Sequence, residues 1–445
     1  MAKGKDLTQG KELRVLLQLA IPIMLSSLLQ MTYNFVDMIF VGRLGSDAIA
    51  SVGTAGSFIN LGYAINALVV IGAGIKISHA VGAKNQEQTG QYLHAAYWFN
   101  GVIALGYATF LLVFLKPLIQ FFALPAHVSG MAEGYLAISA FMLIPSFFNI
   151  LYSRLFSSFG DSKTALRVSM IGVVVNILLD PIFIFGLDLG VNGAALASVT
   201  ANMIMTLLFV WYSRHWMPQT MKKFIRVPKS CFQAIAKLGF PMTTQRILFT
   251  LIGILMARLI ANFGADAIAA QKIGLQIESL TFMVIGGLNA ATASFIGQNY
   301  GAKLWPRIRQ GYRSAILVAI AYTLVTMTIF LVFPEPIVRV FVDTPETVQL
   351  AVDYLRIIGL TQLFSAVEMV TNGAFSGLGQ AKYPAIISIT FTALRLPIAI
   401  LLMPFIGLNG VWWSLAISSA LKGIIAYLVF QKKGLKQHEE NFKAV

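Results

Sequence analysis

Residues 45–50, Gly-Ser-Asp-Ala-Ile-Ala, recur as Gly-Ala-Asp-Ala-Ile-Ala at residues 264–269, an offset of 219 (264 minus 45). Three further pairs of similar stretches keep this offset: 19–22 with 238–241, 82–84 with 301–303, and 156–157 with 375–376. A constant offset over such a distance indicates an internal duplication. The fold is therefore expected to consist of two related halves.

The composition of the chain is that of a membrane protein. It has 445 residues, of which 57% are hydrophobic and 11% charged, and its mean hydropathy is +0.75. Soluble domains are about 25% charged, which argues against a soluble globular enzyme. A transmembrane helix needs about 20 apolar residues, and apolar runs separated by Gly, Pro and charge predict twelve spans. They cover residues 15–41, 50–75, 92–115, 132–155, 164–186, 191–213, 236–262, 267–296, 312–333, 350–375, 383–406 and 409–431.

The duplication organises these spans. Each half contains six of them, an even number, so both halves enter the membrane in the same sense, and such parallel repeats are typical of transporters. The sequence therefore predicts an all-α integral membrane protein with twelve transmembrane helices in two six-helix parallel repeats, forming two lobes. The N-terminal lobe is expected to cover residues 1–213 and the C-terminal lobe residues 236–445, joined by a basic cytoplasmic linker, residues 214–235.

The formal net charge of +15 is spread between the apolar segments. It does not indicate a nucleic-acid partner, because the bases form no patch with interleaved aromatic residues. If both termini are cytoplasmic, 24 Lys and Arg residues fall in inner tails and loops and six in outer loops, which satisfies the positive-inside rule. The expected location is the inner (cytoplasmic) cell membrane, with an uncleaved first span. The inner bases include Lys3, Lys222, Lys223, Arg226 and Lys443.

Two acidic residues, Asp37 and Asp180, fall inside the spans of the first half. Counted from the outer ends of their helices, they lie six and eight residues in, roughly 9 to 12 Å below the outer surface at about 1.5 Å per residue. Ser198 lies at the same level, and Asn176 precedes Asp180 by one turn on the same helix face. We expect these four side chains to converge.

The first half offers no base at this depth to neutralise the two carboxylates. Desolvation and mutual repulsion both favour a protonated carboxyl group, so one interpretation is a proton site. The other is a Na⁺ ion held by oxygens of Asp37, Asn176 and Asp180, with a carbonyl freed by Pro181 nearby. Either ion would make this a coupling site. A helix cap or an interhelical hydrogen bond is the structural alternative.

The second half differs in its charges, since Glu278, Glu368, Arg246 and Arg395 all lie at intermediate depth, with Lys422 in the last span. Acids and bases can pair there. Structural ion pairs are favoured over a role in transport, and both interpretations stay open.

Pro22 and Pro241 occupy equivalent positions early in the first helix of each half. A proline inside a helix removes a backbone hydrogen bond and bends the helix. Pro22 is therefore a candidate hinge that lets the first helix bend during transport, and a simple packing kink is the alternative.

No HExxH, GxSxG, P-loop or dinucleotide-binding motif is present. The single cysteine, Cys231, excludes a disulfide framework and a Cys-based metal site. Enzymatic activity and a cofactor are not expected, so transport has to draw on an ion gradient. The expected partners are small amphipathic molecules and the lipid bilayer, and the chain is expected to be a monomer.

Four stretches carry a resemblance to a known family: 30–45 (Gln-Met-Thr-Tyr-Asn-Phe-Val-Asp-Met-Ile-Phe-Val-Gly-Arg-Leu-Gly), 176–181 (Asn-Ile-Leu-Leu-Asp-Pro), 190–198 (Gly-Val-Asn-Gly-Ala-Ala-Leu-Ala-Ser) and 375–379 (Phe-Ser-Gly-Leu-Gly). Together they resemble the multidrug and toxic compound extrusion (MATE) family, over essentially the whole chain. The resemblance implies two six-helix lobes around a central cavity. It also implies secondary active efflux of amphipathic, mainly cationic compounds in exchange for H⁺ or Na⁺.

Within the family the chain is similar to the DinF-like branch, whose coupling site corresponds to Asp37, Asn176, Asp180 and Ser198. That branch typically has Thr in place of the serine, a departure that could alter cation ligation. Where the NorM-like branch carries an acid in the seventh helix, this sequence has Phe249, which argues against coupling through the C-terminal lobe.

The resemblance also suggests which residues line the substrate cavity: Gln30, Tyr33, Asn149 and Asn202. Glu278 matches a common family position whose role it does not settle.

Two other function classes were weighed against a cation-coupled multidrug antiporter. A lipid-linked oligosaccharide flippase of the same superfamily would be expected to line its cavity with several bases, and the spans of the first half have none. An integral membrane enzyme would need a catalytic constellation. The sequence does not indicate the physiological substrate or the choice between H⁺ and Na⁺.

Overall fold

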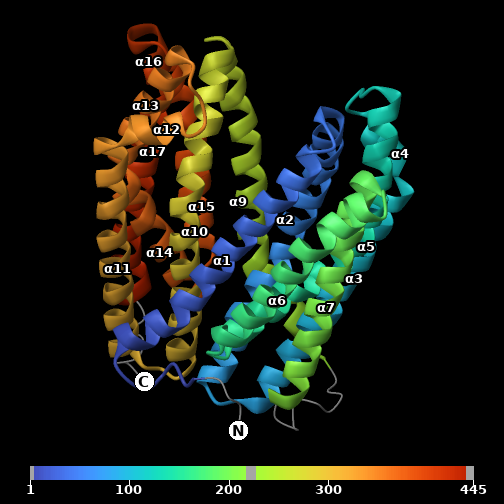
Figure 1. Ribbon diagram of the computed structural model, residues 1–445. Helices are drawn as coiled ribbons and strands as arrows, with labels where there is room; N and C mark the ends of the chain where they lie inside the picture. Colours follow the sequence, from blue (N-terminus) through green and yellow to red (C-terminus); the bar gives the residue numbers. More distant parts are fainter. Residues whose placement is uncertain (1–4, 217–226, 437–445) are drawn as a thin grey trace. The chain divides into compact units, whose positions relative to one another are not determined.

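The computed structural model describes residues 5–216 and 227–436, which form helices joined by short connections (Figure 1). Within these residues, eleven helices are long and apolar enough to cross a membrane, or twelve when α13 (Pro345–Gly359) and α14 (Gln362–Gly377) are counted as one bent span. This confirms the predicted all-α membrane fold. Residues 217–226 of the predicted linker, and the bases Lys3, Lys222, Lys223, Arg226 and Lys443, lie outside the described residues.

The remaining helices of the first half are α1 (Glu12–Gly42), α2 (Ser46–Gly82), α3 (Gln86–Val113), α4 (Leu115–Gln120), α5 (Ala126–Ser158), α6 (Ser162–Pro181), the π-helix η1 (Ile182–Gly186) and α7 (Gly190–Trp216). Those of the second half are α9 (Lys229–Ala261), α10 (Ala265–Gly301), α11 (Trp305–Val332), α12 (Pro334–Arg339), α15 (Lys382–Ala393), α16 (Arg395–Ile406), α17 (Leu408–Val429) and the π-helix η2 (Phe430–Lys436).

The internal duplication is confirmed by the helix boundaries. Adding 219 to the ends of α2 gives the ends of α10 (46 to 265, 82 to 301), and the same shift converts α3 into α11. The short helices α4 and α12, which the hydropathy pattern did not predict, correspond in the same way. Turn geometry repeats too, since Lys84 and Lys303 both adopt a positive φ, 54° and 60°.

Two predicted spans are interrupted in the structure. The span 350–375 is the pair α13 and α14, bent by 54° at a short break. The span 383–406 is divided at Leu394 into α15 and α16. An average of hydropathy over many residues does not respond to a break of one or two residues inside an apolar run, so these breaks were missed.

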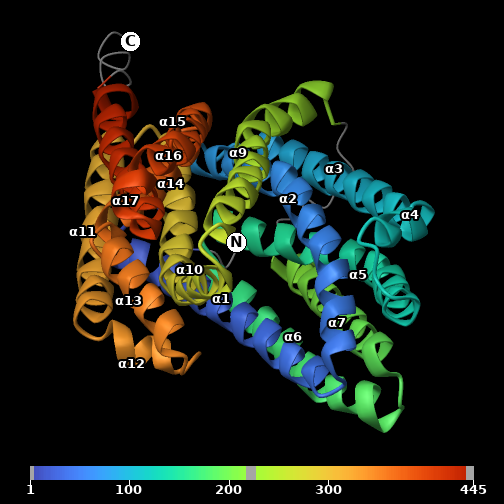
Figure 2. The same cartoon turned by 90° about the horizontal axis from the view of Figure 1, so that it is seen from above.

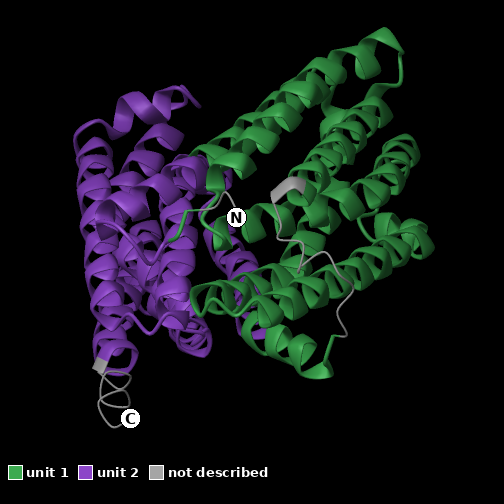
Figure 3. Cartoon of the chain, turned by 90° about the horizontal axis from the view of Figure 1, so that it is seen from below, with its two compact units in different colours: residues 1–6, 25–239 green, residues 7–24, 240–445 purple. Residues whose placement is uncertain are grey.

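The contacts within the chain divide it into two compact units, drawn separately in Figure 3. Unit 1 contains Met1–Asp6 and Leu25–Gly239, and unit 2 contains Leu7–Met24 and Phe240–Val445. The predicted lobes differ from these units at their edges, because residues 7–24 belong with unit 2. Residues 236–239, assigned to the C-terminal lobe, belong with unit 1.

Apolar packing explains this exchange. Leu16 and Leu19 of α1 are buried in the same apolar cluster as Leu288 of α10. The start of α9 is buried in the other unit in the same way, where Ile235 shares a cluster with Val69 of α2. The two arrangements are related by the offset of 219, which converts Leu16 into Ile235 and Val69 into Leu288. Each half of the sequence thus contributes the first part of its first helix to the other unit.

Polar contacts hold the segment before α1 in unit 2. Arg307 donates to the Glu12 carboxylate (Nη1 to Oε1, 3.0 Å) and to the Gly10 carbonyl (2.8 Å). Its Nε donates to Asn299 Oδ1 (3.1 Å), and Asn299 Nδ2 donates to the Leu7 carbonyl (3.2 Å). Leu7 itself is buried. These contacts attach the start of the chain to the α10–α11 end of unit 2.

Within each unit the long helices pack lengthwise (Figures 1 and 2). In unit 1, α5 lies against α2 and α7, and α6 lies against α7. In unit 2, α14 lies against α10, α11 and α17. Pro22 is inside α1, two residues before the point where that helix passes from unit 2 to unit 1. The hinge role of Pro22 stays a prediction.

Replacing Gly239 by Ala should destabilise unit 1, because a Cβ at this position of α9 would overlap the carbonyl oxygen of Leu68 in α2. Overpacking of this kind costs about 1–3 kcal/mol. The measurement is the temperature at which half of the detergent-solubilised protein stays monodisperse on size exclusion. Gly253→Ala is the matched control, since a Cβ on Gly253 of the same helix meets no atom within 4 Å. Equal stability of the two variants would contradict this close approach.

Candidate functional site

The predicted acidic residues come together in unit 1. Asp37 on α1 and Asp180 at the end of α6 lie within electrostatic range of each other. The hydroxyl of Tyr135 on α5 lies within range of both carboxyl groups. Asp180 is 0% exposed and Asn176, one turn before it, 1%. The sequence-based convergence of the two carboxylates is therefore present in the structure.

Ser198 of α7 links the other members of this cluster. Its hydroxyl forms a 2.7 Å hydrogen bond with the Tyr33 hydroxyl of α1, and it accepts a longer one, 3.5 Å, from Asn176 Nδ2 of α6. Ser198 is 3% exposed. Tyr33, which the resemblance suggested for the substrate cavity, thus lies in the acidic cluster and connects α1 to it.

Several oxygens of this cluster have no hydrogen-bond partner among the described residues: Oδ1 of Asp37, both carboxylate oxygens of Asp180, and Oδ1 of Asn176. No Lys, Arg or His in the described ranges forms an ion pair with either carboxylate. Unpartnered buried oxygens are rare in proteins, and buried charges need neutralisation. The arrangement can therefore take up a proton or a hard monovalent cation, with Asp37, Asp180 and Asn176 supplying the oxygens.

The helix changes its geometry directly after Asp180. Pro181 has no N–H to donate, and residues 182–186 form the π-helix η1, in which Leu187 N donates to the Ile182 carbonyl (2.8 Å). Helix α7 packs tightly on this segment, since a Cβ on Gly193 would lie 2.5 Å from the Phe183 carbonyl oxygen. Single-turn π segments are frequent at functional sites. Asp180 is therefore held where the regular hydrogen-bond pattern is interrupted.

Two members of the cluster were missed by the sequence analysis, Tyr63 and Tyr135. Tyr63 of α2 forms a 3.1 Å hydrogen bond with Ser146 of α5 and interacts with Tyr135. One signal was available, because Tyr135 is three residues (135 minus 132) from the outer end of the predicted span 132–155, in the same outer part of the membrane as Asp37. No signal showed which helix face carries Tyr63.

The other proposed cavity residues do not form one group. Gln30 is exposed on α1. Asn149, 4% exposed, donates to the carbonyl (2.9 Å) and to Oδ1 (3.1 Å) of Asn202, and accepts from Thr206 (2.8 Å). Asn149 and Asn202 thus bond α5 to α7, because an amide buried among helices needs partners of its own. The structure gives no support to a cavity-lining role for Asn149.

The buried charges of unit 2 pair differently from the expectation. The Glu368 carboxylate contacts Lys422 (3.1 Å) and accepts from the Ser388 hydroxyl (2.6 Å). Lys422, which the sequence places in the last span with these charges, is thus the basic partner of Glu368, and neither Arg246 nor Arg395 forms an ion pair with it. Arg246 forms no ion pair with a described residue, because its side chain is exposed on α9. For Arg246 the expected ion pair is wrong.

Glu278 and Arg395 use neutral partners. The Glu278 carboxylate accepts from the Tyr354 hydroxyl (3.0 Å) and from Gln362 (3.4 Å). Arg395 donates to the hydroxyls of Ser418 (Nε, 3.2 Å) and Ser419 (Nη2, 3.5 Å). Both acids lie within electrostatic range of Arg395 without an ion pair being formed.

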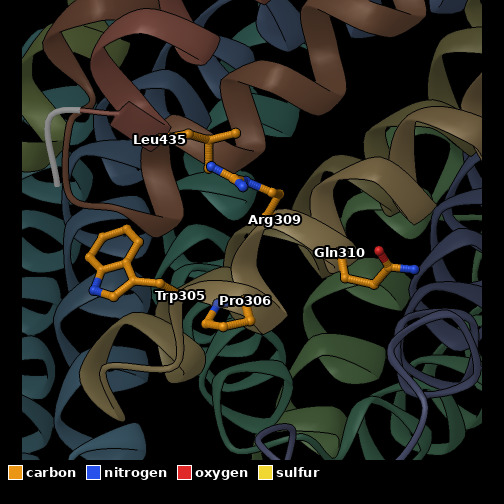
Figure 4. Close-up of a pocket in the computed structure, with 5 residues that line it drawn as sticks. All are labelled: Trp305, Pro306, Arg309, Gln310 and Leu435. Carbon is orange, nitrogen blue, oxygen red and sulfur yellow. The ribbon is translucent and has the colours of Figure 1, made fainter. Parts of the chain in front are cut away.

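A small hollow lies elsewhere in unit 2, between the first turns of α11 and η2 (Figure 4). It measures about 200 Å³ and is lined by Trp305, Pro306, Arg309, Gln310 and Leu435. Sites for small molecules usually measure about 300–1,000 Å³, and the hollow contains none of the residues predicted from sequence. It is therefore not the candidate site.

Fold and site together define a multi-pass α-helical membrane protein of two homologous halves, with an acidic cluster buried in the first. The family model MatE matches residues 22–182 and 241–401, two segments offset by the same 219 residues (241 minus 22). These segments cover more than half of the chain, which therefore belongs to the MatE (MATE) family.

Known proteins are similar over nearly the full length. The chain is 27% identical over 430 residues to a probable multidrug resistance protein NorM of Thermotoga maritima, covering 93% of this chain and 91% of that protein. It is 27% identical over 425 residues to the multidrug export protein MepA of Staphylococcus haemolyticus, covering 94% and 92%. A crystal structure of MATE in complex with MaL6 has a TM-score of 0.91 at 21% identity, covering 98% and 100%.

Glu368→Gln should lower the thermal stability of the detergent-solubilised protein, because it leaves the Lys422 ammonium buried without its carboxylate. Breaking a buried pair by removing one partner costs on the order of 3–5 kcal/mol. The double variant Glu368→Gln/Lys422→Met removes both charges and should recover most of this loss. If the double variant loses the sum of the two single losses, the pair does not couple α14 to α17.

Proposed function

We propose that this chain is a secondary active multidrug antiporter that exports amphipathic, mainly cationic compounds in exchange for H⁺ or Na⁺, coupled through Asp37 and Asp180. The observation that carries the proposal is that the buried Asp180 and the half-buried Asp37 interact and that neither forms an ion pair with a described base. Similar proteins named as multidrug resistance and export proteins support the efflux function. They do not favour the alternative, a lipid-linked oligosaccharide flippase.

The exchange follows from electrostatics. When the cluster is empty, two carboxylates share a low-dielectric environment, and a cationic substrate nearby is attracted to them. When a proton or Na⁺ enters, that attraction is cancelled. Ion and cationic substrate therefore compete for the same negative charge, which is the minimum requirement for antiport.

Helix α1 is the element that can transmit the change. It carries both Asp37 and Tyr33, and the hydrogen bond from Tyr33 to Ser198 attaches it to α7. Neutralising Asp37 alters the balance of contacts that hold α1 in unit 1, and we propose that α1 then repacks, with Pro22 as the hinge. No soluble cofactor is required for this cycle.

The remaining parts of the proposal concern membership and setting. The DinF-like branch fits the cluster of Asp37, Asn176, Asp180 and Ser198 in the first half. The excess of Lys and Arg in the inner loops supports cytoplasmic termini in the inner membrane. The proposed transport unit is a monomer, because the acidic cluster is complete within one unit of one chain.

Asp37→Asn should abolish substrate transport while the protein still inserts and stays monodisperse, because the amide cannot exchange a proton and lacks the negative charge that attracts Na⁺. The measurement is uptake of an organic cation into proteoliposomes with an imposed pH gradient or, separately, an imposed Na⁺ gradient. The gradient that drives wild-type transport identifies the ion. Asp47→Asn is the matched control, since Asp47 is exposed beside His127 and should transport normally. Wild-type transport by Asp37→Asn would reject the coupling site.

A further inference from the structure

The internal repeat allows the acidic site of unit 1 to be compared with the equivalent positions in unit 2. Adding 219 converts Asp37 into Met256 and Asp180 into Ala399, both buried and apolar. The same shift converts Asn176 into Arg395. The shift is secure at these positions, because the two family-model segments end at residues 182 and 401. Unit 2 thus has no acid where unit 1 has two, and a guanidinium where unit 1 has an amide.

Arg395 is held in a defined orientation. It is the first residue of α16, in the middle of the span 382–406, and two of its nitrogens donate to Ser418 and Ser419 of α17. Its guanidinium carbon lies 5.5 Å from the centre of the Phe249 ring on α9, a cation–π contact. Since serines and a ring are neutral, this orientation leaves its charge unneutralised by any direct contact.

Arg246 stands on the same face of α9, one turn before Phe249. Its side chain is exposed, and among the described residues it has no ion pair. It is 17 residues from the start of α9 (246 minus 229) and 15 from its end (261 minus 246), about 25 and 22 Å at 1.5 Å per residue. An arginine at the middle of a membrane span is costly without a partner and marks function by default.

The acids of unit 2 do not supply that partner. Glu368 contacts Lys422 (3.1 Å), and Glu278 accepts from Tyr354 (3.0 Å). Among these buried and mid-span side chains of unit 2, two are acids, Glu278 and Glu368, and three are bases, Lys422, Arg246 and Arg395. Their formal charges sum to +1.

We propose that Arg246, Phe249 and Arg395 form a binding site for small amphipathic compounds that carry a carboxylate or sulfonate beside an aromatic ring. In this proposal the acidic group binds the Arg246 guanidinium on the helix face that carries Phe249, and Arg395, which contacts that ring, adds a second positive charge. The aromatic part lies on Phe249, which is 51% exposed. A phospholipid headgroup is disfavoured as the occupant because Arg246 lies more than 20 Å from either end of α9, by the rise of about 1.5 Å per residue.

This site extends the proposed export function. Binding to the site does not depend on that function, whereas export of the bound compound does. It adds zwitterionic and anionic amphiphiles to the cationic compounds attracted by Asp37 and Asp180.

The test is equilibrium binding of rhodamine B, which has a free carboxylate, and of its ethyl ester, which lacks that charge, followed by fluorescence anisotropy on the full chain in detergent. Wild type should bind the acid more tightly than the ester. Arg246→Gln should weaken binding of rhodamine B about tenfold, the scale of one lost charge-assisted hydrogen bond, and leave the ester unchanged. Arg246→Lys should bind rhodamine B with an affinity between those of wild type and Arg246→Gln, because lysine keeps the charge but lacks the planar guanidinium group.

Arg258→Gln is the matched control, since Arg258 is an exposed arginine in the last turn of the same helix, and it should bind both dyes as wild type does. Equal weakening of acid and ester in Arg246→Gln, or no preference for the acid in wild type, would overturn the proposal. So would displacement of rhodamine B from wild type by phosphatidylglycerol but not phosphatidylcholine, which would assign the arginines to lipid.

Binding without a gradient separates this proposal from the antiport mechanism. Asp37→Asn should keep the preference for rhodamine B over its ester although it does not transport. If the coupling mechanism fails and Asp37→Asn transports normally, the binding result still decides the role of Arg246.

Discussion

A carboxylate removed from water has to be protonated, hydrogen-bonded or placed beside a positive charge. In unit 1 this constraint applies twice, since Asp180 is fully enclosed and Asp37 interacts with it, and no described base is in contact with either. The surrounding side chains are hydroxyls and an amide, which orient a small ion but do not replace it. In the proposed mechanism the neutralising charge is a proton or Na⁺ that arrives and leaves, next to the hydrogen bond between Tyr33 and Ser198 that joins α1 to α7.

The second unit satisfies the same constraint with its own residues. The ends of α2, α3 and α4 repeat in α10, α11 and α12. Glu368, however, stands where the offset of 219 leads from Asn149, and this carboxylate has Lys422 as its counterion. A lysine attached to the chain cannot exchange with solvent. Duplication has thus preserved a scaffold while the charges of the two copies diverged: the acids Asp37 and Asp180 of unit 1 have no ion pair with a described residue, whereas Glu368 of unit 2 pairs with Lys422.

Most of the architecture could be predicted from the sequence because its signals are long. Apolar runs of about 20 residues, and an offset that recurs along the whole chain, are recognisable even where single residues depart from the pattern. These signals located nearly every helix. Short features did not leave such signals: α4, α12 and the break at Leu394 involve a few residues within apolar surroundings. The start of α9 at Lys229, before the predicted residue 236, was missed because its polar residues lower the mean hydropathy while Ile235 is buried against α2.

Residues of the candidate site could be predicted where only their depth in the membrane mattered. Asp37, Asn176, Asp180 and Ser198 were brought together by counting residues from helix ends, since a rise per residue is nearly constant. Depth does not determine which face of the helix carries a side chain. That is why Arg246, placed by its depth among charges that can pair, is exposed and has no ion pair with a described residue.

The exchange of the first helical turns between the units bears on how such a chain could arise. Residues 7–24 complete the apolar core of unit 2, and residues 229–239 complete that of unit 1. A polypeptide made of one repeat alone would leave an unfilled groove and a protruding helical arm. Two such copies would satisfy each other by swapping arms, as in a domain-swapped homodimer. A gene fusion would then need only a linker between the two copies. Each half would still contribute helical residues to the core of the other.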